Sequence, residues 1–289
     1  MAESARAPQQ SILSSVLQRI PPFPAALASI VRACSAENVS ASEIAHAISM
    51  EEVLAAKVVR AANATDLAPV HAIDNVSAAV ARLGASSIRG IASAYYLTNS
   101  FSSAFNHAGL DREALWRHNL TVATASSGAA GSGRERANAY FAGLMHDVGK
   151  MILAAELGHV YAECIAEAQR TGDGLVEVER RRIGIDHADI GAEAAREWHF
   201  APDIVEAIRR HHQVLGAGLL PRVAADVLVG NQIAREMGFT ATTEHSGGNS
   251  AATLSNISAG IGTGIMSRAR WALTNELPKI EAMLTGFTG

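Results

Sequence analysis

The chain has 289 residues, of which 48% are hydrophobic, 18% charged and 5% aromatic, with a formal net charge of −4 and a pI near 6.3. This composition excludes wholesale disorder and allows one large domain or two small lobes. The chain is mildly acidic, which argues against direct nucleic-acid binding. Its single basic run, at 180–182, follows two glutamates and is predicted to lie on a solvated helix face. An alanine-rich chain with few aromatics favours close-packed helices.

The sequence shows no targeting or membrane signal. Residues 1–11 are polar and predict a flexible leader rather than a signal peptide. A long stretch without charged side chains, residues 90–110, carries too many Ser, Thr and Asn residues to cross a bilayer. Cys34 and Cys164 cannot form a disulfide framework and indicate reduced thiols. We therefore expect a cytoplasmic protein with no membrane partner.

Helical periodicity recurs along almost the whole chain. A helix at 11–20 is stopped by the proline-rich segment 21–24, and a capping box at 40–43 opens the next helix. Further helices are predicted at 51–62, 75–83, 86–105, 111–127, 138–156, 160–169, 175–183, 188–199, 203–212 and 223–237, with a loop at 128–136 and two short segments that end near Leu284. No strand pattern is evident, so the predicted fold is all-α: a multi-helix bundle with an N-terminal helical lobe.

The domain organisation follows from one small polar run at 240–251, which is the best linker candidate. We expect a leader at 1–11, one all-helical domain at 12–240 with lobes at 12–110 and 111–240, and a linker with a C-terminal helical extension at 241–289. The sequence leaves two roles open for that extension, covering the lobe interface or mediating assembly, and it does not indicate an oligomeric state.

Histidine and aspartate side chains occur on helix faces that are otherwise apolar. His118, for example, shares its predicted face with Leu115 and Val122. The other members of this set are His187, His211, His212 and Asp226, together with the pair His146–Asp147 inside the apolar run 140–153. Taken alone, any of these histidines is more often a core residue with a satisfied hydrogen bond, and a lone aspartate is more often exposed or a helix cap.

Taken together, the set favours a metal site. A buried unpaired carboxylate is strongly destabilising, and a cation offsets its desolvation. Neutral imidazoles and carboxylates suit a divalent ion such as Fe, Zn, Mn or Ni, and no organic cofactor is indicated. His146 and Asp147 would diverge by about 100° on a regular helix, so we expect Gly149 to allow a bend that turns both towards one ion. Lys150 either holds an anion near the metal or is a snorkelling surface lysine.

The segment 143–150 (GLMHDVGK) resembles the His-Asp signature of the HD superfamily, and His118 before it and Asp226 after it follow the order of that superfamily. More particularly, the chain resembles the HDOD family, the HD-related output domain of bacterial signalling proteins. The matching segments are 21–24 (PPFP), 42–48, 59–64 (VRAANA), 79–84 (AVARLG), 184–188 (GIDHA), Trp198 and 202–212 (PDIVEAIRRHH).

The resemblance implies an all-helical HD-like bundle and a signalling role in which enzymatic activity is usually absent. By position, the four-ligand HD site corresponds to His118, His146, Asp147 and Asp226, and the extra histidines of the HD-GYP relatives, the cyclic-di-GMP phosphodiesterases, correspond to His187, His211 and His212. The chain departs from these relatives because residues 213–220 (QVLGAGLL) lack Gly-Tyr-Pro, which argues against cyclic-di-GMP hydrolysis. It also lacks the usual HDOD Asp-Pro turn, because residues 50–52 (MEE) occupy that position.

Two functions follow as hypotheses. The first is a bacterial signal-transduction and response-regulation module that acts through signalling-protein partners, is non-catalytic and holds a divalent metal. The alternative is a metal-dependent phosphohydrolase or phosphodiesterase of the HD superfamily, in which Lys150 would be a catalytic residue that stabilises developing charge. The resemblance favours the first, and the complete set of candidate ligands supports the second.

Overall fold

The computed structural model describes residues 15–35, 40–64, 72–131, 133–213, 220–240 and 263–285. Within these ranges the regular secondary structure is helical and includes no strand, which confirms the predicted all-α class. The expected leader at 1–11 and nearly all of the expected linker at 240–251 lie outside the described residues. None of the described helices combines the length and apolarity that crossing a bilayer requires.

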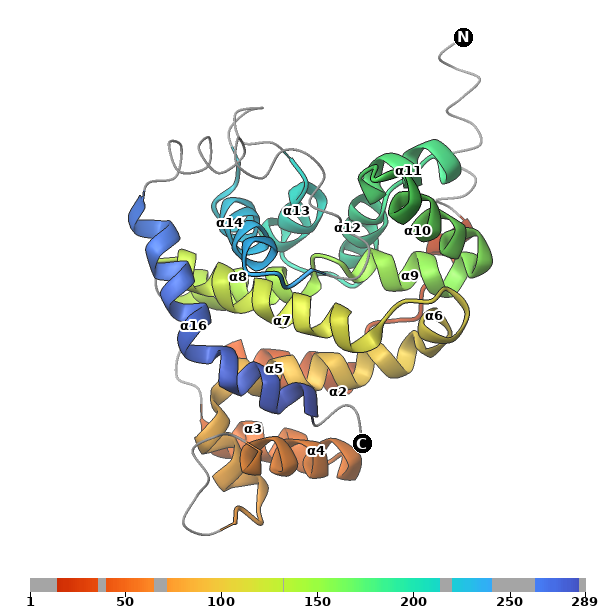
Figure 1. Cartoon of the computed structure of the whole chain (residues 1–289). Helices are drawn as coiled ribbons and strands as arrows, with labels where there is room; N and C mark the ends of the chain where they lie inside the picture. The colour runs from red at the N-terminus through yellow and green to blue at the C-terminus, as the bar shows by residue number, and fades with distance from the viewer. Residues whose placement is uncertain are drawn as a thin grey trace.

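The expected first lobe, residues 12–110, contains α2 (Ala25–Ser35), α3 (Ala41–Ser49), α4 (Glu52–Asn63) and α5 (Val76–Ser100). The predicted cap at the start of α3 is present, because the Ser40 side chain accepts a hydrogen bond from the Glu43 backbone N–H at 3.4 Å. Helix α5 contacts the other three helices and joins them into one unit, and Figure 1 shows α3 and α4 at one end of the molecule.

Gly84 changes the direction of α5 in its middle. Its φ of 78° and ψ of 162° are open to glycine and unfavourable for other residues, so helical geometry is interrupted there. The sequence predicted two helices separated at this glycine. The structure shows them joined as one kinked element that reaches Ser100, where a short helix, α6 (Ser102–His107), follows directly.

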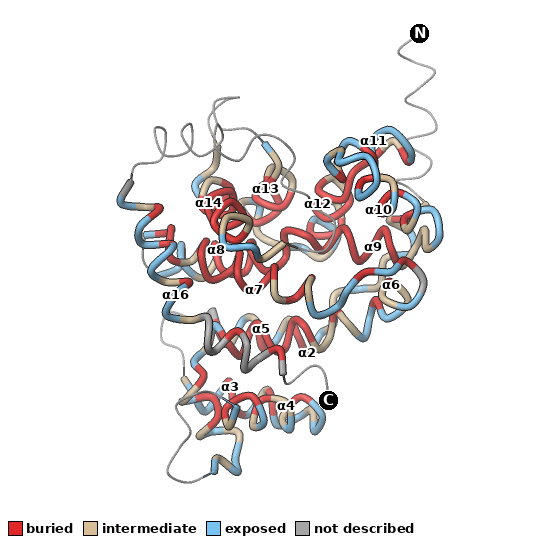
Figure 2. The backbone as a smooth tube through the Cα atoms, in the orientation of Figure 1, coloured by how far each residue is buried: buried red, intermediate tan, exposed pale blue. Residues whose placement is uncertain are grey.

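The second lobe surrounds α7 (Arg112–Ala129), whose side chains are buried along most of its length (Figure 2). It packs against α8 (Gly133–Met145), against α14 (Arg222–Glu236), and against α16 (Thr263–Thr285). The remaining helices are α9 (Val148–Leu157), α10 (His159–Thr171), α11 (Leu175–Ile183), α12 (His187–Glu197) and α13 (Pro202–Arg210). Helix α16 also contacts α4 and α5, so the C-terminal extension crosses both lobes (Figure 1).

The loop expected at 128–136 is shorter than predicted, because Gly128 continues α7 instead of ending it. A Cβ atom at this position would lie 2.5 Å from Cβ of Ala272 and 3.0 Å from Cα of Ala269. The glycine therefore serves the close approach of α16 to α7 rather than a turn.

Replacing Gly128 by valine is expected to push α16 away from α7. Such overpacking costs about 1–3 kcal/mol, so the melting temperature measured by circular dichroism should fall by several degrees. Gly174→Val is the matched control, because the nearest atom to a Cβ there, Glu177 Cδ, is 4.0 Å away. Equal melting temperatures for the two variants would contradict the close packing of α16.

Candidate metal centre

The chain junctions around α7, α8, α12 and α13 bring six polar side chains together. His118 lies in α7, His187 is the first residue of α12, and the others are His146, Asp147, His211 and His212, just beyond the ends of α8 and α13. All six are buried except His212, which is partly exposed. The structure therefore brings together six of the seven ligand candidates chosen from the sequence.

The bend at the His-Asp pair differs from the prediction. The sequence favoured one helix over 138–156 with flexibility at Gly149, whereas α8 ends at Met145 and α9 begins at Val148, so the break falls on the pair itself. Gly149 has another role: a Cβ atom there would lie 1.9 Å from the backbone oxygen of His187. The glycine allows α9 to pack directly against the start of α12.

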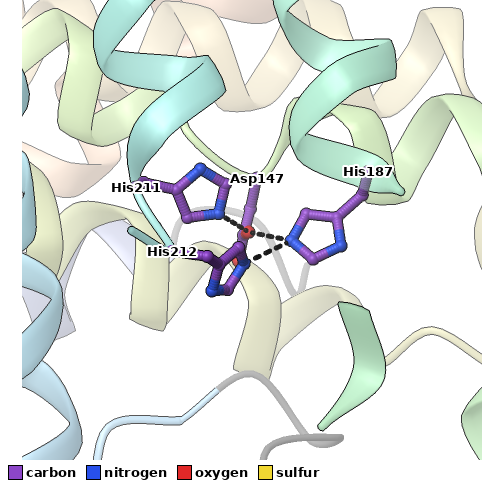
Figure 3. A group of neighbouring side chains, drawn as sticks. All are labelled: Asp147, His187, His211 and His212. Carbon is purple, nitrogen blue, oxygen red and sulfur yellow. Dashed lines mark hydrogen bonds and ion pairs between the residues drawn. The ribbon is translucent and has the colours of Figure 1, made fainter. Parts of the chain in front are cut away.

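The Asp147 carboxylate lies between two sets of imidazoles. Its Oδ1 atom is 3.4 Å from Nε2 of His187 and 3.4 Å from Nε2 of His211. Its Oδ2 atom is 3.4 Å from Nε2 of His146 and 3.6 Å from Nε2 of His118. We call Asp147, His187, His211 and His212 the α12–α13 group (Figure 3), and Asp147, His118 and His146 the α7–α8 group. In each group the potential ligand atoms lie within 4.8 Å of one another.

The proton positions on three of the imidazoles follow from their backbone partners. Nδ1 of His118, His146 and His211 lies 2.6–2.8 Å from a carbonyl oxygen, those of Phe239, Gly143 and Ile208 respectively. A carbonyl oxygen only accepts, so Nδ1 must donate in each case. When these rings are neutral, their Nε2 atoms carry lone pairs, and all three lone pairs face Asp147.

His187 is held by a buried carboxylate that the sequence did not single out. Glu179 Oε2 accepts from the Nδ1 and the backbone N–H of His187 at 2.7 and 3.0 Å, and its Oε1 accepts from the Tyr161 hydroxyl at 2.7 Å. Burial opposes a charge on His187, but the Glu179 and Asp147 carboxylates outweigh it and raise the pKa of His187 to about 9. A carboxylate behind an imidazole is the usual support of a metal-ligating histidine.

Hydrogen bonds within the protein do not satisfy every polar atom of these two groups. Nε2 of His118 and Nε2 of His146 are 3.2 Å apart, and Nε2 of His187 and Nε2 of His212 are 2.8 Å apart. Burial lowers the pKa of His211 to about 4, so this ring is neutral at pH 7. Its Nε2 atom and Oδ1 of Asp147 are buried without a hydrogen-bond partner. A cation between these atoms would satisfy acceptors that the protein itself leaves unsatisfied.

Lys150 is fully buried, so the interpretation as a snorkelling surface lysine is wrong. Its Nζ donates to Asp147 Oδ2 at 2.7 Å. Burial by itself would raise the pKa of Asp147, but the neighbouring His146 and Lys150 side chains outweigh burial and lower it well below its ordinary value. Asp147 is therefore a carboxylate anion at neutral pH.

Asp226, the seventh candidate, belongs to neither group of the described residues. It lies in the second turn of α14 and accepts from Arg222 Nε at 3.3 Å, while the backbone oxygen of Phe239, beyond the other end of the helix, contacts His118. Ten helical residues rise about 15 Å, which is too far for a shared ligand position. The sequence order led to α14, and the segment after this helix does contact His118 through Phe239. The position of Asp226 along the helix, however, does not support this residue as a ligand.

Comparisons with known proteins show the family of the chain. The HDOD domain family profile matches residues 20–214, which is more than half of the chain. The chain belongs to the HDOD family. A comparison with curated proteins gave no match.

Solved structures support the same fold. An HDOD domain protein of unknown function from Geobacter sulfurreducens is 20% identical with a TM-score of 0.73, and the alignment covers 98% of each chain. A protein from Shewanella amazonensis SB2B, named provisionally as a phosphohydrolase, is 21% identical with a TM-score of 0.70, covering 96% of this chain and 98% of that one. A signal transduction protein, so named provisionally, from Marinobacter aquaeolei VT8 is 19% identical with a TM-score of 0.74, covering 98% of this chain and 66% of that one.

Asp226→Asn is expected to stabilise this HDOD domain at neutral pH. Burial raises the pKa of Asp226 to about 6 although Arg222 opposes the rise, so the folded state disfavours its charge. Since the folded pKa lies above the unfolded one, the penalty is absent below about pH 4 and complete above about pH 7.

The gain in unfolding free energy should therefore be about 1–2 kcal/mol at pH 7.5 and vanish near pH 4. Thermal unfolding of the variant and the parent across this pH range measures it. Asp74→Asn, at an exposed site, is the control. A loss of stability at pH 7.5 in the Asp226 variant would contradict the assigned direction.

Proposed function

We propose that this HDOD protein is a signal-transduction module that holds a divalent metal ion in the α12–α13 group and acts through protein partners without hydrolysing a substrate. One observation carries the metal proposal: Nε2 of His211 and Oδ1 of Asp147 face each other at 3.4 Å and are buried without a hydrogen-bond partner, beside the imidazoles of His187 and His212. Membership of the HDOD family and the likeness to a provisionally named signal transduction protein support the signalling role.

The α12–α13 group is the better site of the two. It offers three imidazoles and Oδ1 of Asp147, whereas the α7–α8 group offers two imidazoles and an Oδ2 atom that already accepts from Lys150. The Lys150 ammonium supplies positive charge on that side of the carboxylate. His118 and His146 then complete the polar shell around Asp147. The raised pKa of His187 means that metal binding must displace a proton from this imidazole. The resulting donor set of neutral imidazoles and one carboxylate suits Fe, Zn, Mn or Ni.

The enclosure of the centre supports a regulatory rather than a hydrolytic role. Of its six residues only His212 is not buried. Three cavities of about 720, 680 and 270 Å³ are lined by other residues of the described chain. A bound divalent ion would supply a fixed charge and Lewis acidity. The protein residues around it hold the centre rigid, since the Nδ1 atoms of His118, His146 and His211 are anchored to backbone carbonyl oxygens and that of His187 to Glu179.

A phosphohydrolase is the second candidate. It is favoured by the cation Lys150 beside Asp147, and by two similar structures from Shewanella amazonensis SB2B, 21% and 18% identical, that are named provisionally as phosphohydrolases. In that case Lys150 would be the group that neutralises charge on a phosphate.

Elemental analysis of the purified protein tests the metal proposal. We expect divalent metal in the parent and in Asp226→Asn, and at least a tenfold weaker affinity in Asp147→Asn and in His211→Gln. The binding is measured by titrating the chelator-treated proteins with Zn²⁺, Mn²⁺ and Ni²⁺ in a calorimeter. Circular dichroism verifies that each variant is folded. Equal metal affinity in all four proteins would contradict the proposed site.

A phosphodiester panel separates the two functions. The metal-loaded protein is incubated with bis-p-nitrophenyl phosphate, p-nitrophenyl phosphate and cyclic dinucleotides, and release of product is followed by absorbance or chromatography. We expect no turnover above that of Asp147→Asn. Metal-dependent turnover that disappears in Asp147→Asn and falls sharply in Lys150→Met would instead establish the phosphohydrolase.

Glu179→Gln is expected to weaken metal binding about 10–100-fold, because an amide no longer holds the His187 ring with a negative charge. Glu177→Gln is the matched control, since Glu177 is exposed on the same helix two residues away. Calorimetric titration of both variants with the metal found in the parent measures the effect. The same affinity in the two variants would show that Glu179 does not support the ligand.

A further inference from the structure

A cavity of about 680 Å³ lies between the first lobe and the second. Its walls come from α5 and Cys34 of α2 on one side, and from α7, α8 and α16 on the other. Small-molecule sites in proteins occupy roughly 300–1,000 Å³ and are common where lobes meet. The described lining contains none of the six residues of the metal centre, so this cavity is a separate feature.

The charged side chains of the lining are mostly cationic. Arg89, Arg134 and Arg136 line the cavity, against a single carboxylate, Glu276, among its described residues. This excess of positive charge occurs in a chain whose formal net charge is −4. Guanidinium groups bind phosphate and carboxylate with paired hydrogen bonds, so the lining is suited to an anion.

Arg89 is fixed at the buried end of this arrangement. It is only 2% exposed, although it is an arginine in the middle of α5. Its guanidinium donates to the backbone oxygen of Ala137 at 3.2 Å and lies over the Tyr140 ring, 5.1 Å from the centroid. Arg134 and Arg136 are exposed, so they stand at the open end. A buried, oriented arginine is costly to maintain and is often retained for ligand binding.

Two helix starts add to the positive potential. The interruption at Gly84 means that a new run of helix begins with residues 85–87, and these three residues line the cavity. Helix α8 also begins there, with Gly133 and Arg134 in the lining. The first N–H groups of a helix lack intrahelical acceptors and carry partial positive charge, which favours a phosphate nearby.

We propose that this cavity binds a small phosphate-bearing ligand with a planar ring, such as a nucleoside diphosphate. The arginines and the two helix starts hold the phosphates. Trp271, which lines the cavity and is 70% exposed, offers a face on which a ring stacks. Such a ligand would contact α5 of the first lobe together with α8 and α16, and would thereby fix one lobe against the other.

The test uses ADP, inorganic pyrophosphate and adenosine as probes of the full-length protein in a calorimeter. The proposal expects saturable binding of ADP and pyrophosphate, with ADP the tighter of the two, and no measurable binding of adenosine. The experiment is run after chelator treatment, so that phosphate bound through a metal does not contribute. Absence of saturable binding of both anions would overturn the proposal.

Variants at the exposed end locate the site without disturbing the core. Arg134→Gln and Arg136→Gln should each weaken ADP binding about tenfold, because each removes a charge-assisted hydrogen bond. Arg170→Gln removes the same charge from the exposed surface of α10 and should leave ADP binding unchanged. Equal weakening in all three variants, or in none, would overturn the assignment to this cavity.

The ring contact is tested separately by Trp271→Ala. This variant should weaken ADP binding about tenfold while leaving pyrophosphate binding unaffected, because it removes the aromatic face on which the ring stacks. Loss of both ligands together would contradict the division of the cavity into a phosphate end and a ring end.

Discussion

The arrangement of this protein depends on one buried charge, the carboxylate of Asp147. It is fully buried, lies 3.4–3.6 Å from the Nε2 atoms of four imidazoles, and accepts from Lys150 at 2.7 Å. Burial of such a charge is tolerated only where partners surround it. The break between α8 and α9, the close contact of Gly149 with the start of α12, and the anchoring of each imidazole all serve this one group.

The same constraint explains why so many polar residues occupy an otherwise apolar core. Each imidazole that faces Asp147 needs its outer nitrogen satisfied, and this is achieved by carbonyl oxygens at three positions and by Glu179 at His187. The Tyr161 hydroxyl in turn donates to Glu179. The polar network thus extends from α7 to α10 and α11, and helps to connect helices that are distant in the sequence. A bound cation would add its own ligand contacts to this network.

Sequence patterns predicted the helices well where a cap or a glycine marks the boundary. The bounds of α11 and the cap of α3 agree with the prediction, because local chemistry determines them. The loop expected at Gly128 is instead a helix, since the glycine allows close packing against α16, which is far along the chain. Such close approaches leave no signal in the local pattern.

The candidate metal centre was predictable in part, where local patterns mark its residues. Five histidines and Asp147 were identified because they interrupt apolar faces. Glu179 was missed because the basic run that follows it was interpreted as part of a solvated helix face. The signal that could have found it is its spacing of four residues from both Leu175 and Ile183, which are buried on the same face. Asp226 was chosen because it interrupts an apolar face too, but its partner is Arg222. Pattern and order alone do not distinguish a ligand from a buried ion pair.

The most direct test of this account is anomalous diffraction from crystals of the protein grown with the metal it binds. Data collected on either side of the absorption edge of that metal locate the ion without reference to activity. The account predicts an anomalous peak enclosed by Asp147 Oδ1 and the Nε2 atoms of His187, His211 and His212. A peak at Asp226, or no peak at all with the metal in excess, would contradict it.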